Sequence, residues 1–200
     1  MTHPPLADPG LLRRRDRPLE RWRNGGGTTR VVAIDPPGAV LANGFRWRVS
    51  IASVAADGPF SRLPGTDRIL WLLGGKGMRL RVGDRSVMLN RPLQRVDFAG
   101  EVPVEAHLID GPTEDLNVMT DRASVAPAVV VARLEAGAAL DVALSAPQNL
   151  VVVLSGAPTM EGFAAGLECG DAVRIDGVRS VRWRAPAGPS DLLALGFHPR

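Results

Sequence analysis

The chain has 200 residues, of which 45% are hydrophobic and 22% charged, so it is long enough to form one or two domains with buried cores. Its formal net charge is only +3, and its arginines alternate with apolar residues along predicted strands without an aromatic stacking run, which argues against nucleic-acid binding. No apolar segment approaches a membrane span and the N-terminus lacks signal-peptide features, so we expect a soluble cytoplasmic protein.

A triple glycine at residues 25–27 precedes the first predicted strand, residues 28–34. The stretch lacks the GxxxxGK[ST] pattern of a phosphate loop, and no helix is predicted after it. Glycine permits a close approach of the backbone, so we expect this segment to lie against a neighbouring strand or a ligand. Asn24 and Thr28 supply polar groups on either side of it.

The stretch from residue 45 to residue 77 contains two strands and a polar loop. Residues 45–52 alternate between apolar and polar side chains, which is typical of a strand with two different faces. The uninterrupted apolar run at residues 69–73 predicts a strand buried on both faces. The loop between them carries Ser61 and Arg68, and it is therefore a candidate anion-binding rim.

The remainder of the chain reads as short strands separated by turn residues, without a sustained helical period. Residues 120–127 are predicted to be a connector. This pattern predicts a β-sandwich or barrel. The predicted strands are residues 78–82, 86–89, 94–98, 104–109, 116–119, 128–134, 149–154, 172–175, 181–183 and 192–197.

The pattern of five apolar residues and a glycine turn that begins at Ile69 recurs at Leu150. A Gly-Asp pair follows each copy, at Gly83 and at Gly170, and each half then ends in an apolar strand. Two copies of one β unit are therefore predicted, packed as a double barrel.

Several linked motifs within residues 20–122 resemble, in order, the HutD/Ves family. The C-terminal half is similar only in its strand and turn pattern. The motifs are RWRNGGGT at residues 21–28, WRVSIA at 47–52, DGPFS at 57–61, PG followed by DR at 64–68, and DLNVM at 115–119.

The resemblance implies an all-β bicupin, with two double-stranded β-helix (jelly-roll, cupin) barrels in one chain. An N-terminal barrel with an N-terminal arm is expected over residues 1–122, and a smaller cupin-like barrel over residues 123–200; whether the two exchange strands is left open. HutD proteins are associated with bacterial histidine utilisation, which they are thought to restrain or tune by binding a small acidic intermediate such as formylglutamate. Ves-type members are linked to stress responses.

Many cupins hold a metal ion with three histidines and a glutamate, but this chain has only three histidines and no HxH pair. Phe60, Ser61, Arg62 and Leu63 stand where the first cupin motif would place its histidines. We therefore expect no metal and no cofactor. The histidines are His3, His107 and His198, and we expect His107 to be hydrogen-bonded locally on a strand.

Cys169 is the only cysteine, so the chain has neither a disulfide framework nor a cysteine-based metal cluster. A serine triad through Ser61 would need a nearby histidine that the sequence does not supply. No catalytic residue is assigned.

A carboxylate-binding pocket fits the polar residues better, because an arginine fork matches a carboxylate and hydroxyl or amide groups complete its shell. Arg48 and Ser50 share one face of their strand, but the sequence does not decide which face lines the barrel. A structural salt bridge is the alternative role for each arginine. The candidate ligand-binding residues are Asn24, Thr28, Arg48, Ser50, Ser61, Arg68 and Asn117.

The function that these features favour is metal-independent binding of a small carboxylate metabolite that modulates histidine utilisation. The alternative is a cofactor-independent enzyme acting on a small carboxylic acid, with Asp57, Asp67 or Glu114 as general base. A protein–protein adaptor is a third option. No nucleic-acid or membrane partner is expected, and a homodimer is left open.

Overall fold

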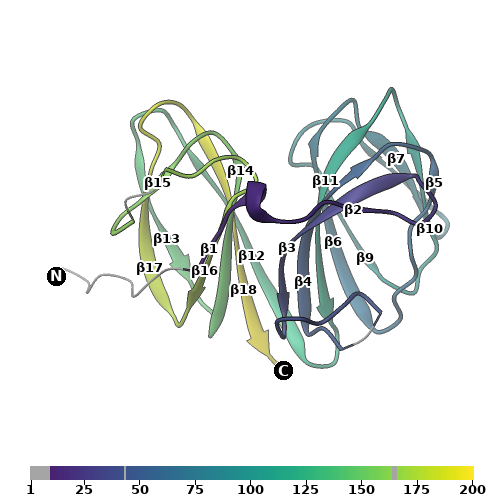
Figure 1. Ribbon diagram of the computed structural model, residues 1–200, viewed down its shortest axis with the longest axis horizontal. Coiled ribbons are helices and arrows are strands. Elements are labelled where there is room, and N and C mark those ends of the chain that lie inside the picture. Colours follow the sequence, from purple (N-terminus) through teal and green to yellow (C-terminus); the bar gives the residue numbers. More distant parts are fainter. Residues whose placement is uncertain (1–9, 43, 164–165) are drawn as a thin grey trace. The chain divides into compact units, whose positions relative to one another are not determined.

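The computed structural model describes residues 10–42, 44–163 and 166–200. Across these residues all regular elements are β-strands, apart from a single 3-10 turn, η1 (Arg14–Asp16) (Figure 1). The predicted all-β class is therefore confirmed. The strands divide into two compact units, which we call the N-terminal barrel (residues 17–125 with Arg200) and the C-terminal barrel (residues 10–16 and 126–199).

The N-terminal barrel consists of a six-stranded sheet and a four-stranded sheet. The six-stranded sheet has the order β2 (Glu20–Arg21), β3 (Gly27–Asp35), β4 (Trp47–Val54), β11 (Thr113–Asp121), β6 (Thr66–Gly74) and β9 (Arg95–Ala99). The four-stranded sheet has the order β5 (Gly58–Pro59), β10 (Val104–Leu108), β7 (Met78–Val82) and β8 (Arg85–Leu89).

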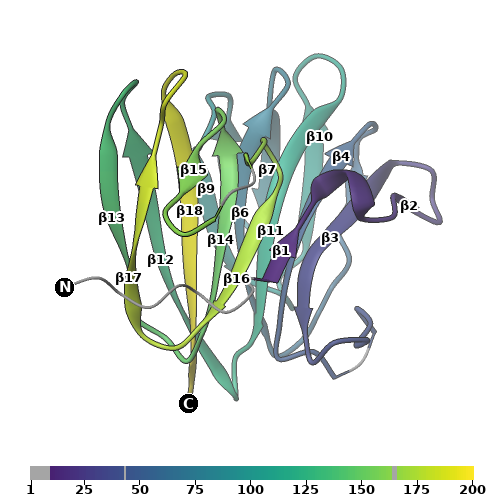
Figure 2. The same cartoon turned by 60° about the vertical axis from the view of Figure 1, so that its left-hand side comes forward.

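The C-terminal barrel consists of a five-stranded and a three-stranded sheet (Figure 2). The first has the order β1 (Gly10–Leu12), β16 (Ala172–Asp176), β14 (Gln148–Ser155), β18 (Ser190–Pro199) and β12 (Val125–Leu134). The second has the order β13 (Ala139–Leu144), β17 (Arg179–Arg184) and β15 (Thr159–Met160).

The N-terminal arm does not belong to the barrel to which the sequence analysis assigned it. Strand β1 pairs antiparallel with β16, with Leu11 opposite Val173. Asp171 holds this arm in place, because its carboxylate accepts hydrogen bonds from the Arg13 side chain and from the Arg14 backbone, both at 2.8 Å. Residues 10–16 are therefore part of the C-terminal barrel.

Alternation along the strands builds the core of the N-terminal barrel. In β7, Met78, Leu80 and Val82 are buried, whereas the intervening Arg79 and Arg81 are exposed. Buried apolar side chains from each of the strands β6 to β10 form one cluster, to which the six-stranded sheet contributes Leu70, Leu72, Val96 and Phe98. This cluster defines which side of each strand faces the barrel interior.

The structure adds the short strands β1, β2, β5 and β15 to those predicted, and it changes the prediction at two longer segments. Strand β13 was not predicted, because Ala139–Leu144 is rich in alanine and contains Asp141, residues that are depleted in strands. The predicted connector at residues 120–127 is largely strand, since β11 continues to Asp121 and β12 begins at Val125.

Gly27 makes the close backbone approach that was expected of the triple glycine. A Cβ atom added at Gly27 would lie 2.4 Å from the Ser53 carbonyl oxygen of the neighbouring strand. A larger residue would therefore push β3 away from β4.

Among the residues that the structure describes, no helix has the length and apolar character needed to cross a membrane.

Candidate functional site

Both faces of β4 are buried, and its pairing decides which face lines the barrel. Antiparallel residues that stand opposite each other point to the same face of a sheet. Met119 stands opposite both Arg48 and Arg68, and Asn117 stands opposite Ser50 and Leu70. Because Leu70 belongs to the apolar core, these polar side chains share the interior face, while Trp47, Val49 and Ile51 are buried on the other.

Five polar residues of three adjacent strands form one group, which we call the arginine cluster. None of them is more than 6% exposed. Arg48 Nη1 donates to Ser50 Oγ at 2.8 Å. Arg68 donates to Asn117 Oδ1 from Nε (3.2 Å) and from Nη2 (3.1 Å), and Asn117 Nδ2 donates to Asp115 Oδ1 at 3.3 Å. The arginine cluster comprises Arg48, Ser50, Arg68, Asp115 and Asn117.

Two aromatic rings and a loop carbonyl hold the Arg68 guanidinium. Its Cζ atom lies 5.0 Å from the Phe98 ring centroid and 5.5 Å from that of Phe60, within the range of a cation–π contact. Its Nη1 donates to the Ser61 carbonyl oxygen at 3.2 Å. Three of the five guanidinium N–H groups therefore have acceptors among the described residues, and two are left for a ligand.

The charges of the arginine cluster do not balance. Burial lowers the pKa of Arg68 to about 10, with the charge of Asp115 opposing and that of Arg48 adding to this effect. Burial also lowers the pKa of Arg48, against the attraction of Glu20. For Asp115, burial raises the pKa to about 7, opposed by the hydrogen bond from Asn117 and by the charge of Arg68. Two cations therefore face one carboxylate that is partly protonated near neutral pH.

Asp115→Asn is expected to flatten the pH dependence of stability. The folded-state pKa of Asp115 is raised above its ordinary value of 3.8, so the folded protein binds the proton more tightly than the unfolded chain. The free energy of unfolding should then fall as the pH rises from about 4 to about 7, by at most about 4 kcal/mol from this group alone. Urea unfolding across that range checks the prediction, and an equal slope in the variant would contradict it.

Asn24 and Thr28 do not join the arginine cluster, and Ser61 reaches it through its backbone alone. Asn24 is exposed, and its Oδ1 accepts a hydrogen bond from the Gly26 backbone at 3.0 Å. Thr28 stands opposite Ser53, on the face of the sheet that points away from the cluster. The Ser61 side chain is exposed.

Thr29, and not Thr28, lies on the cluster's face of the sheet, opposite Ala52. It accepts a hydrogen bond from Trp22 Nε1 at 2.7 Å. The one-residue difference places these two threonines on opposite faces, because successive side chains of a strand alternate. The sequence alone did not contain the pairing that distinguishes them.

Asp115 is the member of the arginine cluster that the sequence analysis did not select. The available signal was its position two residues before Asn117 on one strand, which puts both side chains on one face. The carboxylates considered as general bases lie elsewhere. Asp57 is exposed and bonded to the Leu108 backbone, Asp67 is paired with Arg122, and Glu114 lies on the opposite face of β11.

The donor set of the arginine cluster does not suit a metal ion, because two guanidinium groups would repel a cation. Within the described part of the chain, no three His, Cys, Asp or Glu side chains are arranged to hold one. His107 is exposed on β10, with its Nδ1 atom 3.3 Å from Asp57 Oδ2, and His198 lies 3.2 Å from the Ser145 hydroxyl. His3 lies outside the described residues.

The C-terminal barrel carries a different set of side chains at the equivalent positions. The repeat that aligns Ile69 with Leu150 places Asn149 at the position of Arg68. In the pairing of β14 with β18, Gly196 stands opposite Asn149 and Ala194 opposite Val151, as Met119 and Asn117 stand opposite Arg68 and Leu70. Arg68 and Asn117 are thus replaced by Asn149 and Ala194.

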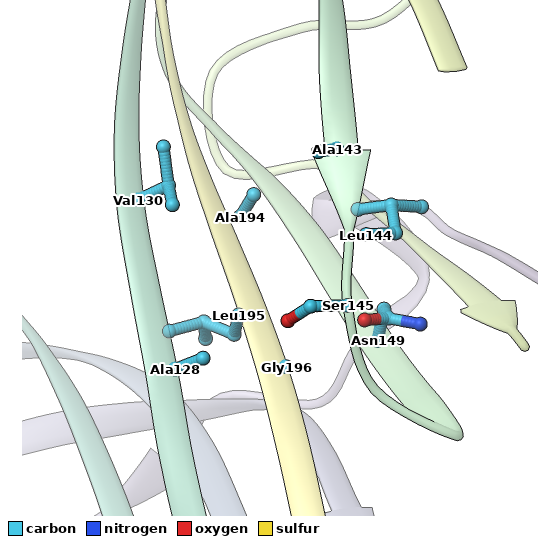
Figure 3. Close-up of a pocket in the computed structure, with 9 residues that line it drawn as sticks. All are labelled: Ala128, Val130, Ala143, Leu144, Ser145, Asn149, Ala194, Leu195 and Gly196. Carbon is cyan, nitrogen blue, oxygen red and sulfur yellow. The ribbon is translucent and has the colours of Figure 1, made fainter. Parts of the chain in front are cut away.

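Asn149, Ala194 and Gly196 line a small hollow of about 20 Å³, enough for a single water molecule (Figure 3). The Asn149 amide is already engaged, since its Oδ1 accepts from the Ala146 backbone and its Nδ2 donates to the carbonyl oxygens of Ala146 and Ile175. The described residues of this barrel therefore contain no counterpart of the arginine cluster.

A family model described as HutD matches residues 14–191, most of the chain. The chain belongs to the HutD family. The family model also covers the C-terminal half of the chain, where the sequence motifs gave only a similar pattern of strands and turns. It also confirms the expected family.

Relatives named Protein Ves are similar to about half of the chain. The protein from Escherichia fergusonii is 40% identical over 107 residues, which is 53% of this chain and 54% of the relative. The protein from Cronobacter sakazakii is 42% identical over 106 residues, which is 52% of this chain and 56% of the relative. The aligned part thus spans about half the length of these relatives.

Solved structures confirm the cupin fold. A conserved protein of unknown function from Pseudomonas aeruginosa PAO1 has a TM-score of 0.85 at 31% identity, covering 96% of this chain and 100% of the other. HutD from Pseudomonas fluorescens SBW25 gives 0.80 at 24% identity with the same coverage. An oxalate decarboxylase from Bacillus subtilis gives 0.69 at 11% identity, covering 99% and 79%, which shows the fold alone.

Proposed function

We propose that this HutD-family protein binds a small carboxylate metabolite at the arginine cluster, without a metal ion, and thereby modulates histidine utilisation. The observation that carries the proposal is the charge imbalance between two buried guanidinium groups and one carboxylate with a raised pKa. A buried excess of positive charge is costly, and a bound anion would relieve it.

Arg68 presents the geometry that recognises a carboxylate. The Phe60 and Phe98 rings lie within cation–π distance of the guanidinium, and two of its five N–H groups have no acceptor among the described residues. Arg48 on β4 and Arg68 on β6 both stand opposite Met119 of β11, the strand between them. From the spacing of strands in a sheet, their Cα atoms are about 10 Å apart. Ser50 and Asn117 add neutral polar groups between them.

The link to histidine utilisation rests on family membership and on the resemblance from which formylglutamate was inferred as ligand. A related HutD structure from Pseudomonas fluorescens carries the description "Formate condition", and formate is the smallest carboxylate. The enzyme alternative has less support, since Asp57, Asp67 and Glu114 do not reach the arginine cluster.

Calorimetry with formylglutamate, formate and urocanate tests the proposal. We expect at least one of them to bind, with one site per chain because the C-terminal barrel has no counterpart of the cluster. Formamide, the neutral analogue of formate, should not bind. Arg68→Ala should weaken the affinity at least about 30-fold, the loss expected when a buried charged partner is truncated.

Arg79→Ala is the matched control, because Arg79 is exposed on β7 of the same barrel. It should bind as the unmodified protein does. If none of the three carboxylates binds, the ligand assignment is removed; equal losses in the Arg68 and Arg79 variants would show that the arginine cluster is not the site.

A further inference from the structure

The Asn117 amide links a buried cation to a buried carboxylate. Its oxygen accepts from Arg68 Nε and Nη2 at 3.2 and 3.1 Å, and its nitrogen donates to Asp115 Oδ1 at 3.3 Å. The side chains of Arg68, Asp115 and Asn117 are at most 5% exposed. The orientation of this amide is therefore set from both ends, and it depends on Asp115 being an acceptor.

An anion at Arg68 would compete with the Asn117 oxygen. The Nε and Nη2 edge is the part of a guanidinium that binds a carboxylate with two parallel hydrogen bonds, and in this structure the amide oxygen occupies it. The same anion would bring a second negative charge close to Asp115 in a buried environment. Like charges disfavour the ionised form of a carboxylate, so Asp115 would hold a proton more tightly.

We propose that carboxylate binding at Arg68 is coupled to the uptake of one proton by Asp115. The side-chain amide of Asn117 flips between the ligand-free and the ligand-bound state, so that its oxygen and nitrogen exchange places. The proposal rests on the function proposed above. A proton from solvent adds to the Asp115 carboxylate, and the new O–H donates to the Asn117 oxygen. The amide nitrogen then donates to the bound carboxylate, and the edge of Arg68 is free to bind it.

Charge and hydrogen bonds balance in both states. The anion adds one negative charge and the proton one positive charge, so the net charge of the arginine cluster does not change on binding. Before binding, the Asn117 oxygen accepts hydrogen bonds from Arg68 and its nitrogen donates one to Asp115. After binding, the Asn117 oxygen accepts a hydrogen bond from protonated Asp115 and its nitrogen donates one to the ligand. Each polar group of the relay keeps a partner, as burial requires.

The surroundings of Asp115 set the pH at which it takes up the proton, and this pH is near neutral. Arg68 on β6 favours the ionised carboxylate, whereas Glu114, its neighbour on β11, favours protonation. Arg48 on β4 lies in the same cluster, with Glu20 on β2 acting on it. Burial outweighs the attraction to the cation and raises the pKa of Asp115 to about 7, so a bound anion would shift its protonation within the physiological range.

Titration calorimetry with formate in two buffers of different ionisation enthalpy measures the proton count. Between about pH 7 and about pH 8 we expect roughly 0.5 to 1 proton taken up per formate, and an affinity that falls towards tenfold per pH unit above about pH 7.5. Asp115→Asn should bind formate without proton uptake and with an affinity independent of pH. Asp97→Asn, at an exposed aspartate on β9 of the same sheet, should retain the coupling.

The outcomes separate this inference from the proposed function. Formate binding by the unmodified protein with identical heats in both buffers and no pH dependence would overturn the proton coupling and leave the binding site standing. Absence of carboxylate binding would overturn both. The proton count of the unmodified protein decides the matter by itself, even where the Asp115 variant does not fold.

Discussion

Replacing Arg48 by methionine is expected to stabilise the ligand-free protein by about 1 kcal/mol or more and to weaken carboxylate binding at least about 30-fold. Arg48 is 6% exposed, and its positive charge repels that of Arg68 in the same cluster. Methionine fills a similar volume without a charge to desolvate. The arginine is thus expected to favour binding at a cost to stability, as at many functional sites.

Thermal unfolding and formate calorimetry on the same samples check both halves of this prediction. Arg79→Met is the control, because an exposed arginine on β7 should change stability by no more than about 0.5 kcal/mol and leave binding unaltered. An Arg48→Met variant that is less stable and binds formate normally would show that Arg48 has a structural role. The hydrogen bond from Arg48 to Ser50 is what such a role would use.

Trp183→Ala is expected to lower the free energy of unfolding by about 3–5 kcal/mol. Trp183 is fully buried in the apolar core of the C-terminal barrel, together with Met160, Val142 and Leu144. Its removal leaves a large cavity that rigid β-sheets cannot close. Because this core cluster is separate from that of the N-terminal barrel, formate affinity should stay within about twofold of the unmodified protein at temperatures where the variant is folded.

Trp183→Phe is the informative companion to this variant. The indole Nε1 of Trp183 is buried without a hydrogen-bond partner among the described residues, so phenylalanine removes an unsatisfied donor as well as volume. We expect it to cost less than about 1.5 kcal/mol. Urea unfolding followed by circular dichroism compares the two, and equal losses in both variants would argue against the cavity explanation.

The extent to which strands could be predicted depended on how clearly their side chains alternate. Strand β7 was predicted with its observed bounds because buried and exposed residues alternate without exception from Met78 to Val82. Strand β13 was missed because its sequence is poor in β-branched and aromatic residues, and its pairing with β17 supplies the stabilisation that its own composition does not.

The candidate site could be predicted in part, for a similar reason. Arg48 and Ser50 were expected to share a face, and they do, because the period of a strand is a local property. Thr28 was predicted as a site residue, but Thr29 is the threonine that lies on the cluster's face of the sheet. The prediction could not distinguish them, because their faces depend on which residue of β3 stands opposite Ala52. Asp115 was overlooked because its raised pKa follows from complete burial, which no local pattern contains.

The sequence by itself determined the all-β class, the repeated β unit and the polar residues from which the arginine cluster is drawn, because alternation, turn residues and motifs are properties of short segments. Only the tertiary structure decided that Arg48 and Ser50 face the barrel interior. Both faces of β4 are buried, so hydrophobicity could not choose between them, and the register with β11 did. The register of β11 with β6 brings Arg68, Asn117 and Asp115 together in a buried environment, and this burial raises the pKa of Asp115.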